Sequence, residues 1–321
     1  MRNMGCEDFS KAMGVKEEMN AEAEITDIQR FSVHDGTGIR TLVFFKGCPL
    51  RCIWCHNPET QRKQPQLFCI ESKCIHCGAC ILACPKQAVS VKGEEIVTDR
   101  TRCVECGECV KVCFSGARKI VGRKYTVEEI EKVLQDEVFY KYSGGGVTLS
   151  GGDPVAHIEF ACELLLRLKQ LGIHTAIETC GVCCEEDFTR LLENVDLVLF
   201  DLKHTDTEMH KKYTGSGNEL PLKNLEVIKK MQKPLIIRVP LIPNFNDNEK
   251  NLRNTAKYAL KFGAYQVHLL PFHQLGESKW KSLDRHYLLA GKDEPSPDIL
   301  KRARSIFEGY GLNVNVGGYG G

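Results

Sequence analysis

The chain has 321 residues, of which 42% are hydrophobic and 26% are charged, so it holds enough apolar material for one large domain or two ordinary ones. Its 43 basic and 42 acidic side chains leave a formal net charge of +1, which favours neither nucleic acid nor an anionic membrane as a partner. Seventeen residues are cysteines, and twelve of these lie between Cys48 and Cys113. Because disulfide scaffolds are normally small secreted chains with cysteines throughout, this clustering excludes that class and indicates reduced thiols that bind metal.

The first 24 residues carry charged side chains where a signal peptide needs an apolar run. No segment of the sequence approaches the ~18 consecutive apolar residues that a membrane-spanning helix requires. We interpret residues 1–24 as a polar N-terminal extension. We expect a cytoplasmic, monomeric protein with neither a membrane nor nucleic acid as a partner.

After this extension, short apolar segments alternate with amphipathic ones that are typical of helices. Six of the apolar segments are predicted to be buried strands: residues 41–45, 146–150, 173–177, 196–200, 235–239 and 266–272. Six β–α units predict a parallel sheet covered by helices, which is either a doubly wound open sheet or a full or partial (β/α) barrel. Polar or ligand-type residues occur at the carboxyl end of every strand, where barrels place their chemistry, so we favour a barrel formed by residues 25–65 and 121–321.

A second pattern is the spacing Cys-x2-Cys-x2-Cys-x3-Cys, which occurs twice, 29 residues apart. It is typical of bacterial ferredoxins, in which three cysteines of one run and the last cysteine of the other hold each [4Fe-4S] cluster. This rule assigns one cluster to Cys74, Cys77, Cys80 and Cys113, and the other to Cys103, Cys106, Cys109 and Cys84. Because residues 66–120 show little apolar periodicity, we predict a small inserted ferredoxin-like domain held together by its clusters. A pair of zinc sites is the alternative, and it would leave thiolates unused.

A different cysteine motif follows the first predicted strand: Cys48, Cys52 and Cys55, with spacings x3 and x2. Three thiolates can hold three irons of a cubane and leave the fourth iron open to a reactant. Taken alone, the triplet is equally compatible with zinc. Its position, in a barrel whose other strand ends carry polar groups, favours a reactive cluster.

The triplet resembles the signature of radical S-adenosylmethionine (SAM) enzymes. Residues 47–59, GCPLRCIWCHNPE, resemble the activating enzymes of glycyl-radical enzymes, the group typified by pyruvate formate-lyase activating enzyme. The resemblance runs from about residue 25 to the C-terminus and is strongest to members with a two-cluster ferredoxin insert. It implies an α/β fold, a partial (β/α)6 TIM-like barrel with that insert.

The same resemblance implies an oxidoreductase with three [4Fe-4S] clusters and SAM. Reductive cleavage of SAM at the cluster of Cys48, Cys52 and Cys55 would give a 5′-deoxyadenosyl radical. That radical would take a hydrogen atom from a glycine of a partner glycyl-radical enzyme, with a flavodoxin or ferredoxin-type protein as the electron donor.

Several residues acquire expected roles by this resemblance. The expected SAM-binding residues are Trp54, Cys55, His56, Gly151, Gly152, Asp153, Glu178, Asp201, Leu202, Lys203, Arg238 and His273. Family members usually have Glu at the position of Asp153. Glu178, Thr179 and Asp201 resemble acidic strand-end positions that in the family line the SAM pocket and can hold a monovalent cation. The segment DGTGIR resembles the family's DGPGIR loop, which implies partner contacts from Asp35, Gly36, Gly38 and Arg40.

Two other functions remain open at this point. A radical SAM enzyme that acts on a small molecule would share the barrel and the triplet but not the use of the residue 35–40 loop. A ferredoxin-type electron carrier would explain the insert alone. Considered singly, Lys203 or His273 is more often an ordinary polar residue than a ligand, so it is their joint placement that indicates a site. The remaining cysteines fit no ligand spacing: Cys6, Cys69, Cys162, Cys180, Cys183 and Cys184.

Overall fold

The computed structural model of the chain describes residues 21–135 and 139–317. Residues 1–20 of the predicted N-terminal extension lie outside these ranges. The last residues of that predicted extension belong to the first strand, which begins at Glu22. No helix in the described ranges has both the length and the apolar character needed to cross a membrane.

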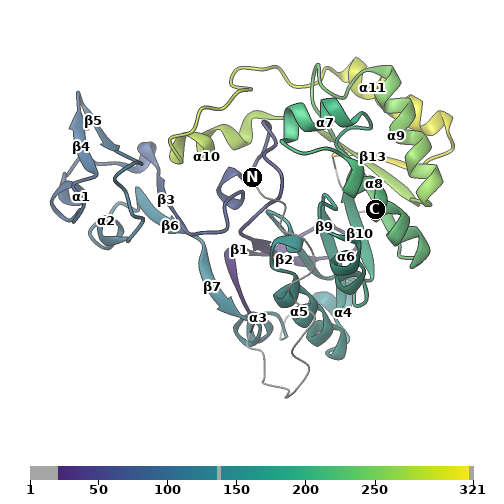
Figure 1. Ribbon diagram of the computed structural model, residues 1–321, viewed down its shortest axis with the longest axis horizontal. Coiled ribbons are helices and arrows are strands. Elements are labelled where there is room, and N and C mark those ends of the chain that lie inside the picture. The colour runs from purple at the N-terminus through teal and green to yellow at the C-terminus, as the bar shows by residue number, and fades with distance from the viewer. Residues whose placement is uncertain (1–20, 136–138, 318–321) are drawn as a thin grey trace.

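A nine-stranded sheet forms the centre of the molecule, with the order β13-β12-β11-β10-β9-β8-β2-β1-β7 (Figure 1). Its strands are β1 (Glu22–Ser32), β2 (Arg40–Phe45), β7 (Arg123–Thr126), β8 (Gly146–Gly151), β9 (His174–Thr179), β10 (Leu197–Asp201), β11 (Leu235–Leu241), β12 (Gln266–Pro271) and β13 (Val314–Val316). Neighbouring strands from β2 to β13 run parallel, whereas β1 runs antiparallel to β2 and β7. The predicted α/β class with a mostly parallel sheet is confirmed.

All six predicted strands are present, and each begins within one residue of its predicted start. From β2 to β13 they lie side by side in chain order, without the reversal that defines a doubly wound sheet, so that alternative is wrong. Three strands of this sheet were not predicted. β1 mixes charged and apolar residues, β7 contains four residues, and β13 contains three, so none of them forms a continuous apolar run.

The helices of this domain lie between or after its strands, and most of them cover one face of the sheet, whereas the helix that carries Trp280 packs against the cysteine loop. They are α3 (Val127–Leu134), α4 (Phe139–Ser143), α5 (Ile158–Gln170), α6 (Glu185–Leu192), α7 (Thr207–Thr214), α8 (Glu219–Lys230), α9 (Glu249–Phe262), α10 (Glu277–Ser282) and α11 (Pro297–Gly309). Val43, Leu149 and Phe200 point toward these helices and are fully buried in the main core. Because successive side chains of a strand point to opposite faces, Ser150 and Asp201 lie on the other face, which is left free for chemistry.

Residues 66–121 project from one side of the sheet (Figure 1). Their elements are β3 (Gln66–Cys69) paired with β6 (Arg118–Val121), β4 (Val89–Lys92) paired with β5 (Glu95–Thr98), and the short helices α1 (Ala79–Leu82) and α2 (Glu108–Lys111). The sequence repeat is also a repeat of backbone conformation. Gly78 and Gly107 precede α1 and α2 with φ of 75° and 80°, and His76 and Glu105 both have positive φ.

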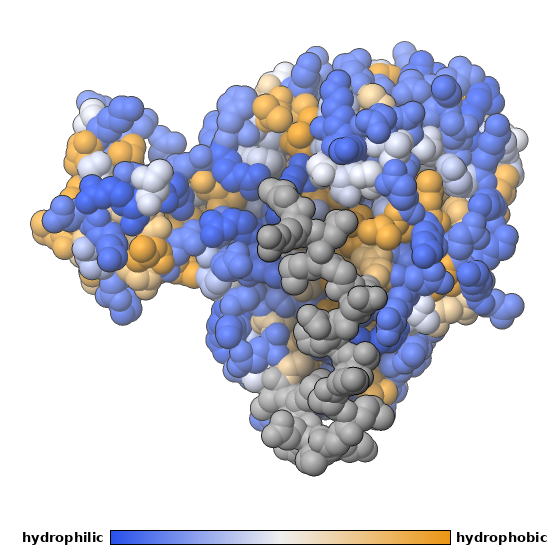
Figure 2. Space-filling view, viewed as in Figure 1, coloured by the Kyte–Doolittle hydropathy of each residue, from blue (hydrophilic) through white to orange (hydrophobic). Residues whose placement is uncertain are grey.

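The projecting segment, which we call the insert, exposes apolar side chains to solvent (Figure 2). Leu82 is 93% exposed and Phe114 is 98% exposed. At its base, Phe68 and Val121 pack against Leu283, which follows α10. Arg100 of the insert also donates to the carboxylate of Asp284 at 2.6 Å. The insert therefore meets the rest of the protein at the segment around α10.

Candidate functional site

A cleft opens at the carboxyl ends of the parallel strands. It receives residues from the loop after β2 and from the ends of β8, β9, β10, β11 and β12. The predicted site residues that line it are Cys48, Cys52, Trp54, Cys55, His56, Gly151, Gly152, Asp153, Glu178, Asp201, Lys203, Arg238, His273 and Asp35. The fold thus brings together residues that are separated by up to 238 positions in the sequence, from Asp35 to His273.

Leu202 is the exception among the predicted cofactor-binding residues. Its side chain is 1% exposed and packs in the main core between the sheet and the helices. Because side chains of extended chain alternate in direction, Asp201 and Lys203 face the cleft and Leu202 faces away from it. The Leu202 side chain therefore lies outside the cleft, and the expected cofactor contact of this residue stays a prediction for its backbone alone.

The loop that carries the cysteine triplet is held by distant parts of the chain. The backbone N–H of Arg51 donates to the carbonyl of Thr214 at the end of α7, at 2.7 Å. The indole of Trp280 in α10 donates to the carbonyl of Cys55 at 2.8 Å. Burial raises the pKa of Cys52 to about 12 and that of Cys55 to about 11, so a metal that binds these thiols displaces their protons.

Gly151 and Gly152 form a tight turn against this loop. Gly151 has φ of 100°, a conformation that favours glycine. A Cβ atom at Gly152 would overlap the carbonyl oxygen of Gly47 and lie 2.8 Å from that of Thr60. The glycines therefore allow the end of β8 to pack closely against the start of the cysteine loop. Their lack of a side chain would also allow a ligand to come close to their backbone.

Asp153 is 1% exposed, and its carboxylate is used within the protein. It accepts hydrogen bonds from the hydroxyl of Thr179 at 2.9 Å, from the backbone N–H of Cys180 at 2.8 Å and from that of Val155 at 3.2 Å. Burial raises the pKa of Asp153. In this structure Asp153 fixes the loop after β9 to the turn after β8, and its side chain positions the cleft rather than reaching into it.

Four charged side chains form a row across the cleft. Arg238 lies between the carboxylates of Glu178 and Asp201, in contact with the first and 3.0 Å from the second. Lys203 donates to the other oxygen of Asp201 at 3.1 Å. Burial alone lowers the pKa of Lys203, but Asp201 outweighs it and raises that pKa above its usual value. Because Arg238 occupies the space between the carboxylates, this arrangement does not fit the monovalent cation that we expected there.

Two imidazole rings provide a flat surface in the cleft. The centroids of His56 and His273 are 3.9 Å apart with an interplanar angle of 33°. Burial, with a contribution from His273, lowers the pKa of His56 to about 4, so this ring is neutral near pH 7. Trp54 also lines the cleft, with its ring 4.7 Å from that of Phe245. Neutral aromatic surfaces of this kind suit the stacking of a planar base.

The loop from Asp35 to Arg40 lies beside the cleft but does not present all four predicted partner residues. Gly38 has φ of 65°, and a Cβ atom there would collide with the backbone of Gly145. Arg40 is completely buried and donates to the hydroxyl of Thr148 and the carbonyl of Val147, both at 2.7 Å. The Arg40 guanidinium therefore supports the loop from beneath, and the expected contact of this residue with a partner stays a prediction.

Within the insert, the structure gathers four of the predicted ligands around one pocket: Cys84, Cys103, Cys106 and Cys109. In the other predicted set, Cys80 and Cys113 interact electrostatically across the repeat. In the described part of the chain, no three His, Cys, Asp or Glu side chains are placed to share one metal ion. Four thiols around one pocket are the ligand number that a [4Fe-4S] cluster requires.

Several site residues were missed by the sequence analysis. Cys180 is 5% exposed and interacts with the thiol of Cys48, although its spacing from the triplet suggests no shared ligand role. Trp280 supports the cleft from α10, which no local motif connects to it, and for Arg40 only its supporting contacts were missed, because the residue itself was expected to face the partner. The signal that was available is their type, because a Trp or an Arg in a buried position normally has a polar partner.

Comparison with known proteins agrees with the residues in the cleft. The chain matches the Radical SAM superfamily over residues 42–256. It is 42% identical over 299 residues to the trans-4-hydroxy-L-proline dehydratase activating enzyme of Clostridioides difficile, with 92% of this chain and 99% of the relative covered. It is 41% identical over 303 residues to the choline trimethylamine-lyase activating enzyme of Oleidesulfovibrio alaskensis, with 92% and 98% covered.

Among solved structures, a domain of pyruvate-formate lyase-activating enzyme from Bacteroides vulgatus is 32% identical. It covers 54% of this chain and 99% of that chain, with a TM-score of 0.47. The near-complete coverage of the activating enzymes, together with the superfamily match, sets the family. The chain belongs to the radical SAM superfamily and, within it, to the activating enzymes of glycyl-radical enzymes.

Proposed function

We propose that this chain activates a glycyl-radical enzyme by means of a [4Fe-4S] cluster held by Cys48, Cys52 and Cys55, with SAM bound beside it in the cleft. The observation that carries the proposal is that the three thiols and the polar ends of five strands line one cleft. When bound, these groups supply the redox chemistry: SAM is cleaved reductively, and a hydrogen atom is lost from a glycine of the partner.

The charges of the cleft are complementary to those of SAM, which carries a carboxylate, an amino group and a sulfonium. Arg238 and Lys203 are suited to the carboxylate, and Glu178 and Asp201 are suited to the two positive groups. The backbone of Gly151 and Gly152 faces the same cleft and can be approached closely because no Cβ atom intervenes. We assign the adenine to the neutral imidazoles of His56 and His273, next to Trp54.

The partner contacts the loop that begins at Asp35, which lines the cleft. Gly36 and Gly38 have φ of 125° and 65°, so this loop has a backbone that bulkier residues would strain. Arg40 holds the loop in place from the buried side. The partner must present a glycine to the cleft. The relatives named above act with different enzymes. We therefore assign to this loop a contact that does not depend on the partner's own substrate.

The insert, which we place at residues 66–120 between the two parts of the sheet domain at 25–65 and 121–321, holds two further [4Fe-4S] clusters. This proposal is supported by one pocket that is lined by Cys84 of the first repeat together with three cysteines of the second repeat. This crosswise sharing is what the ferredoxin rule requires. We assign the insert to electron entry from a flavodoxin or a ferredoxin-type donor, because it projects from the sheet and exposes Cys77 and Cys106.

The test is anaerobic reconstitution of the full chain, followed by incubation with SAM and dithionite. We expect about 12 irons per chain from three four-iron clusters, and release of 5′-deoxyadenosine. Cys52→Ala should abolish that release, whereas the matched control Cys162→Ala, on α5 outside the cleft, should retain it. Release of 5′-deoxyadenosine by Cys52→Ala would contradict the assignment of the cleft. Iron near four per chain would contradict the assignment of the insert.

A further inference from the structure

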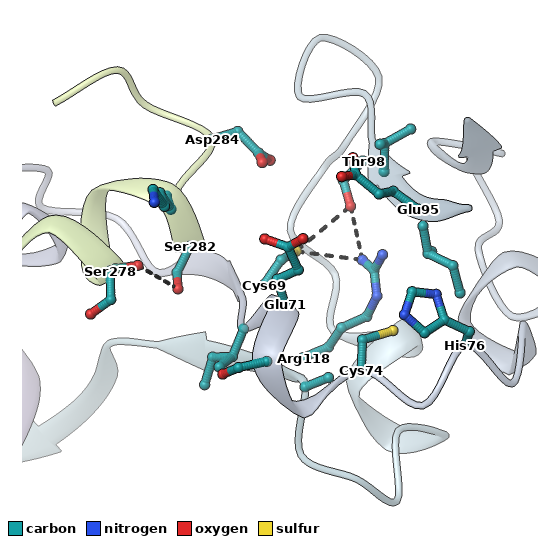
Figure 3. Close-up of a pocket in the computed structure, with 16 residues that line it drawn as sticks. Cys69, Glu71, Cys74, His76, Glu95, Thr98, Arg118, Ser278, Ser282 and Asp284 are labelled. Atoms are coloured by element: carbon teal, nitrogen blue, oxygen red, sulfur yellow. Dashed lines mark hydrogen bonds between the residues drawn. The ribbon is translucent and has the colours of Figure 1, made fainter. Parts of the chain in front are cut away.

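Arg118 lies inside the insert, at the start of β6, and is 6% exposed. Its Nη1 donates to the hydroxyl of Thr98 at 2.9 Å and to the sulfur of Cys69 at 3.7 Å (Figure 3). Cys74, a predicted ligand of one insert cluster, lines the same pocket as Arg118. Burial opposes the charge of the guanidinium, but the thiols of Cys69, Cys80 and Cys109 outweigh it and raise the pKa of Arg118. Arg118 is therefore a buried cation that is surrounded by sulfur.

The partners of Arg118 are related by the sequence repeat. Cys69 and Thr98 are 29 residues apart, which is the period of the repeat, and their side chains lie 3.7 Å from each other. Cys80 and Cys109 are also 29 residues apart, and both belong to the buried cluster of the insert. Burial raises the pKa of each thiol, and the Arg118 guanidinium opposes that rise. Arg118 thus contacts equivalent positions of both halves of the insert.

Arg118 itself has no counterpart, because the residue 29 positions before it is Val89. The two halves share a single guanidinium. Cys80 is a predicted ligand of one cluster and Cys109 of the other, so this guanidinium lies between the two proposed cluster sites.

The position of Arg118 matters because the proposed clusters are negatively charged. A cluster held by four thiolates is negatively charged, and reduction adds one more electron to it. A buried guanidinium is permanently charged, and its attraction to a negative group is weakly screened. A cation next to the ligand sulfurs stabilises the reduced cluster more than the oxidised one, which raises the reduction potential.

We propose that Arg118 is a shared positioning residue that raises the reduction potentials of both insert clusters together, so that the insert accepts electrons at either site. The proposal rests on the two clusters of the proposed function. It makes Arg118 neither a ligand nor a contact of SAM. Thr98 and Cys69 orient its guanidinium, and its charge acts through Cys80 and Cys109.

The experiment is an EPR-monitored redox titration of the reconstituted full chain, with wild type compared with Arg118→Gln and Arg118→Lys. Arg118→Gln removes the charge and is expected to shift the midpoint potentials of both insert clusters to more negative values. Arg118→Lys keeps the charge and should retain potentials close to wild type. The matched control is Lys119→Gln, an exposed neighbour on the same strand, which should leave both potentials unchanged. The cluster of Cys48, Cys52 and Cys55 should be unaffected in every variant.

If Arg118→Gln does not take up iron, Thr98→Asp provides the second test. This variant keeps Arg118 and adds a carboxylate that pairs with its guanidinium. The added negative charge offsets the positive charge and should lower the reduction potentials of both insert clusters. A fully loaded Arg118→Gln or Thr98→Asp protein with unchanged potentials would overturn the proposal, as would a shift confined to one cluster. Failure of the proposed function is distinguishable, because it would appear in the wild type as iron near four per chain.

Discussion

The sheet domain and the insert bury very different side chains. Every parallel strand from β2 to β12 contributes fully buried aliphatic or aromatic residues to the main core, such as Val43, Leu149 and Phe200. The buried cluster of the insert consists of Leu67, Cys80, Val89 and Cys109, and two of these four are proposed cluster ligands. The sheet domain can therefore fold by apolar burial, whereas the insert depends on ligation for its stability.

The largest expected effect comes from removal of iron. We expect chelation under reducing conditions to speed amide hydrogen exchange in β3, β4, β5 and β6 by at least about 100-fold, because structural metal sites contribute most of the folding energy of small domains. Exchange in β8, β9 and β10 should stay slow. Hydrogen-exchange mass spectrometry of the loaded and iron-free chain makes this measurement. Equal protection of the insert in both forms would remove the contrast between the two regions.

The difference between the regions also determines what the sequence could predict. Buried parallel strands require continuous apolar runs, so all six could be found from residues alone. The cysteine runs could be assigned because ligand spacing is local. The supporting contacts of Arg40, Asp153 and Trp280 could not be predicted, because they depend on partners far along the chain: Trp280 donates to the carbonyl of Cys55 across 225 positions. The direction of the Leu202 side chain could not be predicted either, because a family motif does not show which way each side chain points.

The second effect concerns the turn that joins the sheet to the cysteine loop. Gly152→Ala should lower the free energy of unfolding by about 3 kcal/mol, since its Cβ atom would meet two backbone oxygens that cannot move independently. Gly309→Ala is the matched control, because nothing lies within 4 Å of a Cβ atom there and the residue is helical. Urea unfolding of the two variants gives the comparison. A loss below about 0.5 kcal/mol in Gly152→Ala would show that the turn can relax.

A third, smaller effect should appear on acidification of the sheet domain. Burial lowers the pKa of His268 to about 4, against an ordinary value of 6.5. Between those two pH values the unfolded chain binds a proton that the folded chain does not, so stability is complete above pH 6.5 and decreases as the pH falls toward 4. We expect His268 to lower the free energy of unfolding by about 2 kcal/mol between pH 7 and pH 5.

The control for acidification is His268→Gln, which should reduce the slope of stability against pH without removing it, because burial lowers the pKa of other histidines such as His174 and His210. Denaturant unfolding at several pH values separates the two proteins. An identical slope in wild type and His268→Gln would contradict the assignment of acid sensitivity to this residue. The insert contains one histidine, His76, which is exposed, so the effect should be confined to the sheet domain.

The smallest effect is expected at the joint between the two regions. The ion pair of Arg100 and Asp284 spans 2.6 Å, but the Asp284 side chain is 46% exposed. Asp284→Asn should therefore change the free energy of unfolding by less than about 1 kcal/mol, because exposed pairs are screened by solvent. The apolar contact of Phe68 and Val121 with Leu283 should hold the joint in its absence. A loss above about 2 kcal/mol in calorimetry would show that the pair dominates the joint.

The most direct test of the central claim is detection of the product radical. The reconstituted chain would be incubated anaerobically with SAM, a reductant and a purified glycyl-radical enzyme from the same organism. We expect the EPR signal of a glycyl radical on that partner, in an amount equal to the 5′-deoxyadenosine released, and neither product with Cys52→Ala. Cleavage of SAM by the wild-type chain with no radical on the partner would contradict its role as an activating enzyme for that protein.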